Sequence, residues 1–226
     1  MNSKLSTGAK YKCFVCSQDV SSEGRAYNDI GWSKFAAFSN LSIYSCQICG
    51  VGFAMPEFSQ EAIYLFYKDQ YRAKSSAFYI NFNKLRKPGV SDIRVSRAFS
   101  QLSLGRSFCE FNSGDLFLDI GPGKGGSFSV ANALFSKPSL HAIEFSRDAN
   151  DYYMKNFKAE SHSSLEDFAK CGNKAKIVLM SHSLEHFRIP DLPELFIELR
   201  QAMSSDAVIV VEVPNVDMRI HCYNRG

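Results

Sequence analysis

Short, mainly apolar runs alternate with amphipathic stretches through the second half of the chain. Four runs fit buried strands: Leu116–Ile120, Leu140–Phe145, Ala175–Met180 and Ala207–Val213. A fainter strand falls near Lys158–Ser161, and apolar residues at helical spacing predict helices around Phe128, over Arg147–Phe157 and over Leu192–Met203. Repeated strand–helix units with apolar strands predict a parallel sheet covered on both faces, which is an α/β, Rossmann-like doubly wound fold.

The first half of the chain has a weaker pattern. Residues 11–55 form short segments punctuated by Ser and Cys, whereas apolar residues over Glu61–Tyr71 and at helical spacing from Val95 to Leu102 predict helices. Pro88-Gly89 separates these two helices as a turn. The predicted organisation is a small domain at 11–55, a helical linker or cap at 56–112 and the α/β domain at 113–226.

Composition narrows the class of protein. Of 226 residues, 45% are hydrophobic and 22% are charged, which is ordinary for a globular protein. The net charge of +3 comes without a basic block, so no nucleic-acid partner is expected. The N-terminus lacks an apolar core of signal-peptide length, and no apolar stretch is long enough to span a bilayer. We therefore expect a soluble, cytoplasmic protein of undetermined oligomeric state.

Four of the seven cysteines form two C-x-x-C pairs, namely Cys13 with Cys16 and Cys46 with Cys49. Each pair places two thiolates on a tight knuckle, and two knuckles supply the four sulfurs of a tetrahedral Zn²⁺ site. Such a site is structural, because no coordination position stays open. The intervening 29 residues (46 − 16 − 1) exceed the gap of common zinc fingers, so four reduced thiols without metal stay an alternative.

A glycine-rich loop follows the first strand of the α/β domain. Gly121, Gly123 and Gly126 match the G-x-G-x-x-G of dinucleotide folds, whereas Gly121, Gly123 and Gly125 match the G-x-G-x-G of methyltransferases. Glycine is needed because the chain turns sharply and a ligand approaches the backbone closely. The glycines alone do not separate the two cofactor classes.

Two acidic residues are expected beside this loop. Asp119 lies two residues before the first glycine, where an acid fixes the loop and offers a negative field to a cationic ligand such as a sulfonium amino acid. Glu144 ends the second strand, 23 positions after Gly121 (144 − 121), where a carboxylate accepts the ribose hydroxyls of either cofactor. Asp119 favours the methyltransferase interpretation, because a dinucleotide fold usually has an apolar residue there.

The segment Ser181-His-Ser-Leu-Glu-His-Phe187 follows the fourth strand, and Val213-Pro-Asn215 follows the fifth. With the glycine loop, these motifs resemble class I methyltransferases that depend on S-adenosylmethionine, over about residues 115–216. The resemblance implies that the three glycines lie under the methionine and ribose, that Asp119 orients the methionine end and that Glu144 binds the ribose hydroxyls. It also places Leu165 at the border of the adenine.

The cysteine pairs ahead of this domain resemble the N-terminal zinc-binding unit of sugar C-methyltransferases. That resemblance implies a small-molecule acceptor, such as a nucleotide-linked sugar or a polysaccharide precursor, and an aromatic helix near the active site, which makes Tyr71 a candidate for substrate contact. It also places His186 beside the acceptor, where a neutral histidine accepts a proton. His182 is the second candidate base. Local bonding that only holds the loop is the alternative for both histidines.

Two rival functions and one mismatch stay open. A nicotinamide-dependent oxidoreductase shares the fold, but Asp119 and the lack of a Y-x-x-x-K pair count against it. A zinc-ribbon adaptor with an inactive methyltransferase fold is the non-enzymatic rival. The family's sheet has seven strands, whereas the sequence predicts five and has 13 residues after Val213 (226 − 213). We expect a fragment or a shortened enzyme with an exposed sheet edge near Ala207–Val213.

Overall fold

The computed structural model describes residues 11–20, 24–26, 35, 38–56, 60–75, 79–85 and 93–214. The chain divides into two compact units, residues 1–80 and residues 81–226. Within the described ranges, no helix combines the length and the apolar character needed to cross a membrane.

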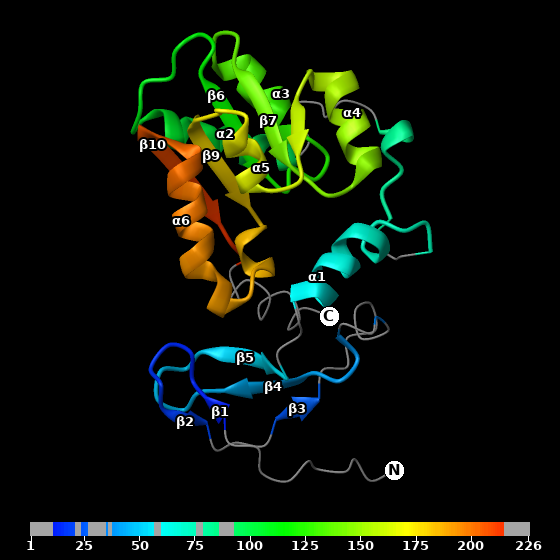
Figure 1. Cartoon of the computed structure of the whole chain (residues 1–226), viewed down its shortest axis with the longest axis vertical. Helices are drawn as coiled ribbons and strands as arrows, with labels where there is room; N and C mark the ends of the chain where they lie inside the picture. The colour runs from blue at the N-terminus through cyan, green and yellow to red at the C-terminus, as the bar shows by residue number, and fades with distance from the viewer. Residues whose placement is uncertain are drawn as a thin grey trace. The chain divides into compact units, whose positions relative to one another are not determined.

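The larger unit contains a five-stranded sheet in which every pair of neighbours is parallel (Figure 1). Its strands are β6 (Leu116–Ile120), β7 (Ser139–Ile143), β8 (Glu160–His162), β9 (Ala175–Ser181) and β10 (Met203–Glu212). Their spatial order is β10-β9-β6-β7-β8, so the chain starts in the centre, builds one side and then the other. This is the predicted Rossmann-like doubly wound fold, and the reversal of direction lies between β6 and β9.

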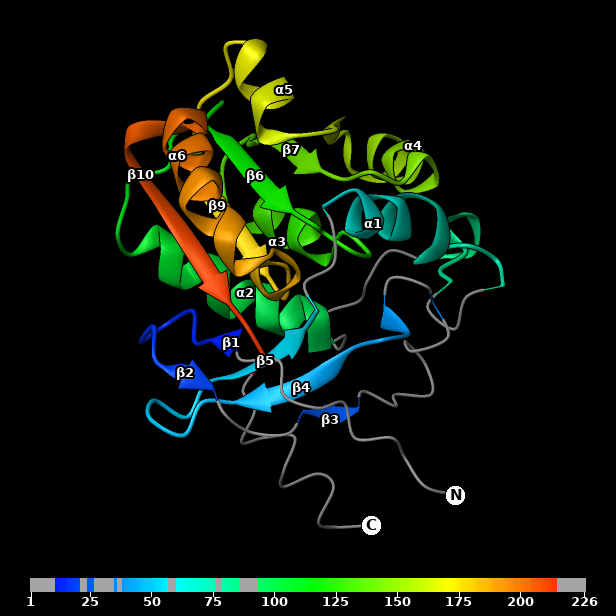
Figure 2. The same cartoon turned by 60° about the horizontal axis from the view of Figure 1, so that its bottom comes forward.

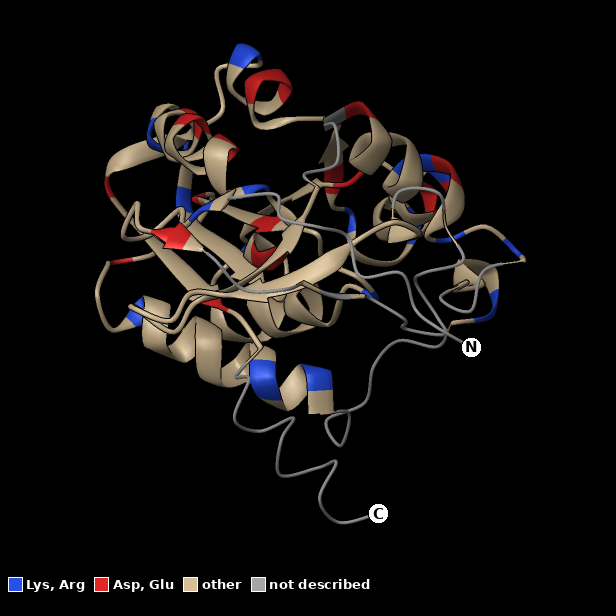
Figure 3. Cartoon of the chain, turned by 90° about the horizontal axis from the view of Figure 1, so that it is seen from below, with Lys and Arg blue, Asp and Glu red and all other residues tan. Residues whose placement is uncertain are grey.

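Helices cover both faces of this sheet (Figure 2). They are α2 (Ile93–Arg106), α3 (Gly126–Leu134), α4 (Arg147–Phe157), α5 (Leu165–Lys170) and α6 (Leu192–Ala202), with short 3-10 helices η3 (Phe82–Lys84), η4 (Leu184–His186) and η5 (Ile189–Asp191). Both signs of charge occur on α4, α5 and α6, whereas α2 carries only Arg and α3 carries no charged residue (Figure 3). Mixed charge of this kind is typical of a solvated helix face.

Strand β6 shows how the two faces are separated. Leu118 and Ile120 pack into the core that includes α5 and α6. The alternate residues turn the other way, since the ring of Phe117 contacts Phe128 of α3 and Asp119 bonds Ser127 of α3. Because successive strand residues point to opposite faces, one apolar run supplies both cores and brings Asp119 beside the start of α3.

Helix α6 begins at Leu192 as predicted, but Asp191 does not cap it with its side chain. The Asp191 carboxylate instead accepts hydrogen bonds from the Arg188 guanidinium at 2.7 and 2.6 Å. Strand β10 starts at Met203, immediately after α6, and its pairing with β9 shifts register between Met203 and Val208. Strand β10 therefore begins before Ala207, the first residue of the predicted strand.

The smaller unit has short antiparallel strands. A hairpin joins β1 (Tyr11–Lys12) to β2 (Asp19–Val20), and a second sheet has the order β3 (Arg25–Ala26), β4 (Ser42–Ser45) and β5 (Gly52–Met55). The core cluster around the cysteines consists of five buried residues, Cys13, Val20, Tyr44, Cys46 and Phe53. Two of the five are cysteines, so the sulfur cluster is part of the core.

The predicted helix over Glu61–Tyr71 is present, but it changes type midway. The α-helix α1 spans Gln60–Leu65 and continues as the π-helix η2 over Phe66–Gln70. The backbone N–H of Tyr71 donates to the carbonyl of Phe66 at 2.7 Å, which is the five-residue spacing of a π-helix.

Candidate functional site

Three left-handed glycines form the loop between β6 and α3. Gly121, Gly123 and Gly125 have φ angles of +76°, +59° and +71°, whereas Gly126 is the first residue of α3. A Cβ added at Gly125 would lie 2.7 Å from the Phe157 ring, while one at Gly123 would meet no atom within 4 Å. The special backbone conformation therefore falls on the G-x-G-x-G set, and the loop backbone is open at its middle glycine.

Asp119 lies directly before this loop and is buried. Burial raises the pKa of its carboxyl to about 7; the Ser127 hydroxyl, which donates to Oδ2, lowers it, Glu144 raises it and Arg97 lowers it. The carboxyl is therefore close to half ionised at neutral pH. A cationic ligand nearby would favour its charged form.

Glu144 follows β7 at the same edge of the sheet. Its Oε1 accepts backbone hydrogen bonds from Phe145 at 3.0 Å and Ser146 at 3.1 Å, which fix the carboxylate. The Tyr153 hydroxyl donates to the Gly123 carbonyl at 2.6 Å and lies 3.5 Å from Glu144 Oε2. Tyr153 thus links the glycine loop to the acidic residue. Sequence reasoning placed it only on a predicted helix.

Ser183 is a buried hydroxyl beside the loop. An added Cβ on Gly121 would lie 3.4 Å from the Ser183 Cβ, so the two residues are neighbours. Ser183 Oγ has no hydrogen-bond partner among the described residues. A buried unsatisfied hydroxyl costs about 1–3 kcal/mol, which a polar ligand would recover. The motif that contains Ser183 was recognised, but only its histidines were singled out.

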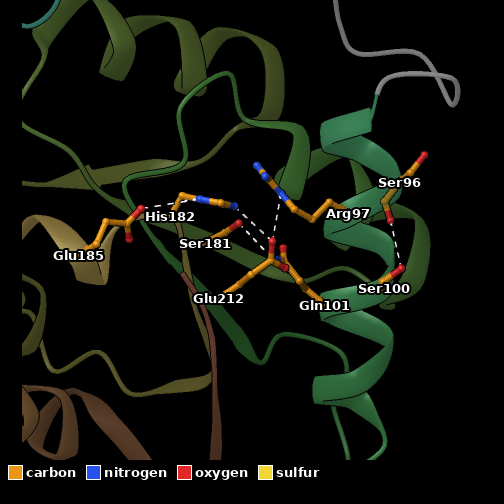
Figure 4. Close-up of polar contacts among 8 residues, drawn as sticks. All are labelled: Ser96, Arg97, Ser100, Gln101, Ser181, His182, Glu185 and Glu212. Atoms are coloured by element: carbon orange, nitrogen blue, oxygen red, sulfur yellow. Dashed lines mark hydrogen bonds and ion pairs between the residues drawn. The ribbon is translucent and has the colours of Figure 1, made fainter. Parts of the chain in front are cut away.

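The ring of His182 lies between two carboxylates (Figure 4). Its Nε2 is 3.2 Å from Glu212 Oε1, and its Nδ1 is 3.7 Å from Glu185 Oε1. The His182 backbone N–H also donates to the Glu212 carbonyl at 2.8 Å, and its φ is +56°. With both ring nitrogens facing carboxylates of the same chain, the geometry favours a brace for the loop over a free base.

Glu212, at the end of β10, is the centre of this polar network (Figure 4). Gln101 of α2 donates through Nε2 to Glu212 Oε2 at 2.7 Å and to Ser181 Oγ at 2.9 Å, and Arg97 Nε lies 3.9 Å from Glu212 Oε1. The network joins α2 to the carboxyl ends of β9 and β10. Arg97 and Gln101 were not predicted as site residues, although the motif Val213-Pro-Asn215, which directly follows Glu212, was noted.

His186 ends the 3-10 helix η4 and keeps an exposed side chain. Desolvation by the surrounding protein lowers the pKa of its ring, against the raising effect of Glu185, so the ring is neutral at pH 7. The other two predicted residues are Leu165 and Tyr71. Leu165 is buried in the core below α5 and α6, and Tyr71 belongs to the smaller unit, with its ring 5.2 Å from that of Tyr67.

The four predicted metal ligands meet in the smaller unit. Their sulfurs all lie within 4.8 Å of one another, with Cys13 to Cys49 at 3.5 Å and Cys16 to Cys46 at 3.6 Å. Four sulfurs at about 2.3 Å from a tetrahedral ion are separated by roughly 3.8 Å. The cluster therefore fits a zinc ion with only a small expansion.

The two knuckles are built alike. The fifth residue of each, Ser17 or Gly50, donates its N–H to the carbonyl of the first cysteine at 2.9 Å and has a left-handed φ, +58° or +74°. Backbone N–H groups of Cys49 and Ile48 lower the pKa of Cys46 to about 6. At Cys16, the N–H of Gln18 has a lowering effect, but desolvation and the neighbouring sulfurs raise the pKa to about 12. Without a cation, the four sulfurs cannot all ionise together.

Acidic residues dominate the carboxyl edge of the five-stranded sheet. Asp119, Glu144, Glu185 and Glu212 lie at or just beyond strand ends, and red segments gather at strand tips in Figure 3. The glycine loop lies beside the point where the strand order reverses, which is where open α/β sheets bind ligands. The fold and this loop define the class of Rossmann-like domains that bind nucleotide cofactors.

The sequence profile of the family described as "Methyltransferase domain" matches residues 95–224. The chain therefore belongs to the methyltransferase domain family, and its sheet has the fold of methyltransferases that depend on S-adenosylmethionine. No curated protein matches this sequence at a significant level.

Several solved structures are similar. The plantazolicin methyltransferase BpumL, solved with a desmethylPZN analogue and SAH, is 20% identical with a TM-score of 0.49, covering 60% of this chain and 53% of that one. A SAM-dependent methyltransferase from Archaeoglobus fulgidus is 20% identical, with a TM-score of 0.46 and coverages of 57% and 59%. Streptomyces venezuelae DesVI is 20% identical, with a TM-score of 0.46 and coverages of 56% and 53%. The chain thus spans about half the length of these structures.

Proposed function

We propose that this chain binds S-adenosylmethionine at the glycine loop and transfers its methyl group to a small-molecule acceptor. The observation that carries the proposal is the left-handed conformation of Gly121, Gly123 and Gly125, next to a buried aspartate at the switch point of the sheet. The third glycine of a dinucleotide loop also lies in the helix, as Gly126 does here, so the left-handed Gly125 and the buried Asp119 carry the choice. The family match supports the same choice over a nicotinamide cofactor.

The residues around the loop suit the parts of this cofactor. Asp119 would face the cationic methionine end, and the backbone at Gly123 is open to close approach. Glu144, held by two backbone N–H groups, would accept the ribose hydroxyls, and Ser183 Oγ would gain the partner that the described residues do not give it. The acidic carboxyl edge favours a positively charged ligand over a dinucleotide diphosphate.

S-adenosylmethionine supplies an electrophilic methyl on a good leaving group, so the protein has to orient the acceptor and remove its proton. We assign the proton acceptor to His186, whose ring is neutral at pH 7 and exposed. His182 is assigned a positioning role, because Glu185 and Glu212 face its two ring nitrogens. An oxygen or carbon acceptor with an exchangeable proton suits this arrangement.

Cofactor choice is tested by thermal shift with S-adenosylhomocysteine and NAD. We expect S-adenosylhomocysteine at 100 times its Kd to stabilise the protein by about 2.7 kcal/mol. Glu144→Gln should weaken binding about 10- to 100-fold, since a hydrogen bond to a charged group contributes about 1.5–3 kcal/mol. Asp151→Asn, on the exposed surface of α4, is the matched control. Stabilisation by NAD alone would reject the proposal.

Once an acceptor is found by screening, His186→Asn separates catalysis from binding. We expect turnover to fall by about 10²–10⁴-fold with unchanged S-adenosylhomocysteine affinity. Turnover equal to that of the unmodified chain would remove His186 from the mechanism. Cofactor binding without turnover on any acceptor would support an inactive adaptor instead.

We further propose that Cys13, Cys16, Cys46 and Cys49 hold one structural Zn²⁺. Their mutual distances support a closed tetrahedral site, and a reducing compartment such as the cytoplasm would keep the four thiols available. The acceptor class proposed, a nucleotide-linked sugar or polysaccharide precursor, rests on the resemblance of this unit to sugar C-methyltransferases. Native mass spectrometry should find one zinc lost on replacing Cys46 by Ser, while loss of no metal would contradict the site.

A further inference from the structure

A second group of metal-ligand residues lies on the edge of the five-stranded sheet. His141 pairs in register with Glu160, and Ile143 pairs with His162, in the parallel ladder of β7 and β8. Residues two apart on a strand share a face, so Ser139, His141, Glu160 and His162 all point to the α5 side. One ring nitrogen from each of His141 and His162 and one carboxylate oxygen from Glu160 lie within 4.8 Å of one another.

The two histidines are already arranged as a ligand pair. His141 Nδ1 lies 3.0 Å from His162 Nε2, and the rings are nearly parallel, with 21° between their planes. Ser139 Oγ lies 3.0 Å from the other nitrogen of His141, Nε2. If Ser139 accepts the Nε2 proton, the lone pair of His141 Nδ1 faces His162, and a single proton is shared between the two rings.

We propose that His141, Glu160 and His162 bind a divalent transition-metal ion such as Zn²⁺. Two histidine nitrogens at 2.0–2.1 Å from a tetrahedral ion are about 3.3–3.4 Å apart, so the rings need to separate by only a few tenths of an ångström. Two histidines and one glutamate are a known zinc ligand set that leaves a fourth position open. Ser139 then acts as the outer partner that orients His141.

The surroundings agree with this assignment. Both histidines are buried and Glu160 is exposed on the edge strand β8, so an ion has a route in from the solvent side. The Phe168 ring packs edge-on against both imidazoles, with centroids 5.4 and 5.2 Å away, which shields the pair.

The proton count of the binding step is balanced. In the metal-free pair the single ring proton of neutral His162 lies on Nε2 and points at His141 Nδ1; on binding it moves to Nδ1 by exchange with water, and the ion takes the lone pairs of both nitrogens. No co-reactant is needed. The site belongs to the larger unit and uses none of the residues assigned to the cofactor or to the cysteine cluster, so it stands independently of the proposed function.

Cobalt titration of the metal-stripped full chain tests the proposal, because the two kinds of site differ spectroscopically. Cobalt bound by four thiolates absorbs strongly in the near ultraviolet, whereas cobalt bound by histidine and carboxylate has only weak visible bands. We expect the chain to bind one equivalent that adds no thiolate absorption. Zinc added to the same sample should shift the ring ¹⁵N resonances of His141 and His162.

Three variants show whether that equivalent of cobalt binds at His141, Glu160 and His162. Glu160→Gln should weaken its binding at least tenfold, and Ser139→Ala should weaken it about 10- to 100-fold, as for other outer partners. Glu166→Gln, on exposed α5, should leave it unchanged. Because Glu160 is exposed, its replacement does not threaten the fold. The proposal is overturned if all bound cobalt carries thiolate absorption, or if Glu160→Gln binds as tightly as Glu166→Gln.

Discussion

The described strands of the smaller unit are two to four residues long, and the core cluster that joins them has five buried residues, of which two are cysteines. The larger unit buries a five-stranded sheet between helices, with eleven fully or nearly buried residues in the core on its α5 and α6 side alone. A core of the first kind cannot offset the entropy of ordering its chain, whereas the second kind can. We therefore expect the smaller unit to depend on metal and the larger unit to fold on its own packing.

The largest expected effect is loss of the smaller unit when its metal is removed. Structural zinc contributes on the order of 10 kcal/mol of apparent folding free energy. Cys46→Ser, or chelation, should abolish the dispersed amide signals of residues 11–20 and 38–56 and leave the thermal transition of the larger unit in place. Cys171→Ser, an exposed cysteine outside the cluster, is the control. Dispersed signals that survive chelation would show that the smaller unit does not depend on a metal ion.

The next effect concerns the larger unit. Gly125→Ala places a Cβ at φ +71° and 2.7 Å from the Phe157 ring. The left-handed conformation costs about 1–2 kcal/mol and overpacking about 1–3 kcal/mol, so we expect a loss of roughly 2–5 kcal/mol in the free energy of unfolding. Gly172→Ala has a similar φ of +76° but meets no atom within 4 Å, so it should lose only the first contribution. Denaturant unfolding compares the two, and equal losses would show that the ring contact does not matter.

A smaller effect should depend on pH. The pKa of Asp119 is raised from 3.8 to about 7 in the folded chain, so the folded state binds a proton that the unfolded state has released. Stability from this group is present below about pH 4 and is lost as the pH rises to about 7. Asp119→Asn should therefore stabilise the cofactor-free protein more at pH 8 than at pH 5, with a difference of about 2–3 kcal/mol. Melting temperatures at both pH values, with Asp151→Asn as control, decide this, and a pH-independent gain would contradict it.

The larger unit was predictable where local pattern and tertiary role coincide. Strands β6, β7 and β9 are buried on both faces, so their apolar runs stand out in the sequence. Strand β8 was faint because it is three residues long and carries Glu160 and His162 in place of apolar groups. The strands of the smaller unit are too short for an alternation to appear.

The candidate site was predictable for residues that belong to local motifs, such as the glycines and the cysteine pairs. Gln101 was not, because its partners Ser181 and Glu212 are 80 and 111 positions away in the sequence. Within the sequence of its own helix, nothing distinguishes Gln101 from the other polar residues. Tyr153 was missed for the same reason, since the Gly123 carbonyl that it binds lies 30 positions before it.

The Tyr153 hydroxyl makes the glycine loop and Glu144 parts of one cooperative unit, which has a consequence for additivity. If the bridge transmits order from one segment to the other, Tyr153→Phe should weaken S-adenosylhomocysteine binding without touching the ligand. Its effect and that of Glu144→Gln should then sum to more than the loss in the double variant, with a coupling of about 0.5–3 kcal/mol. Strictly additive losses of binding free energy, measured by calorimetry, would mean that the glycine loop and Glu144 bind the cofactor independently.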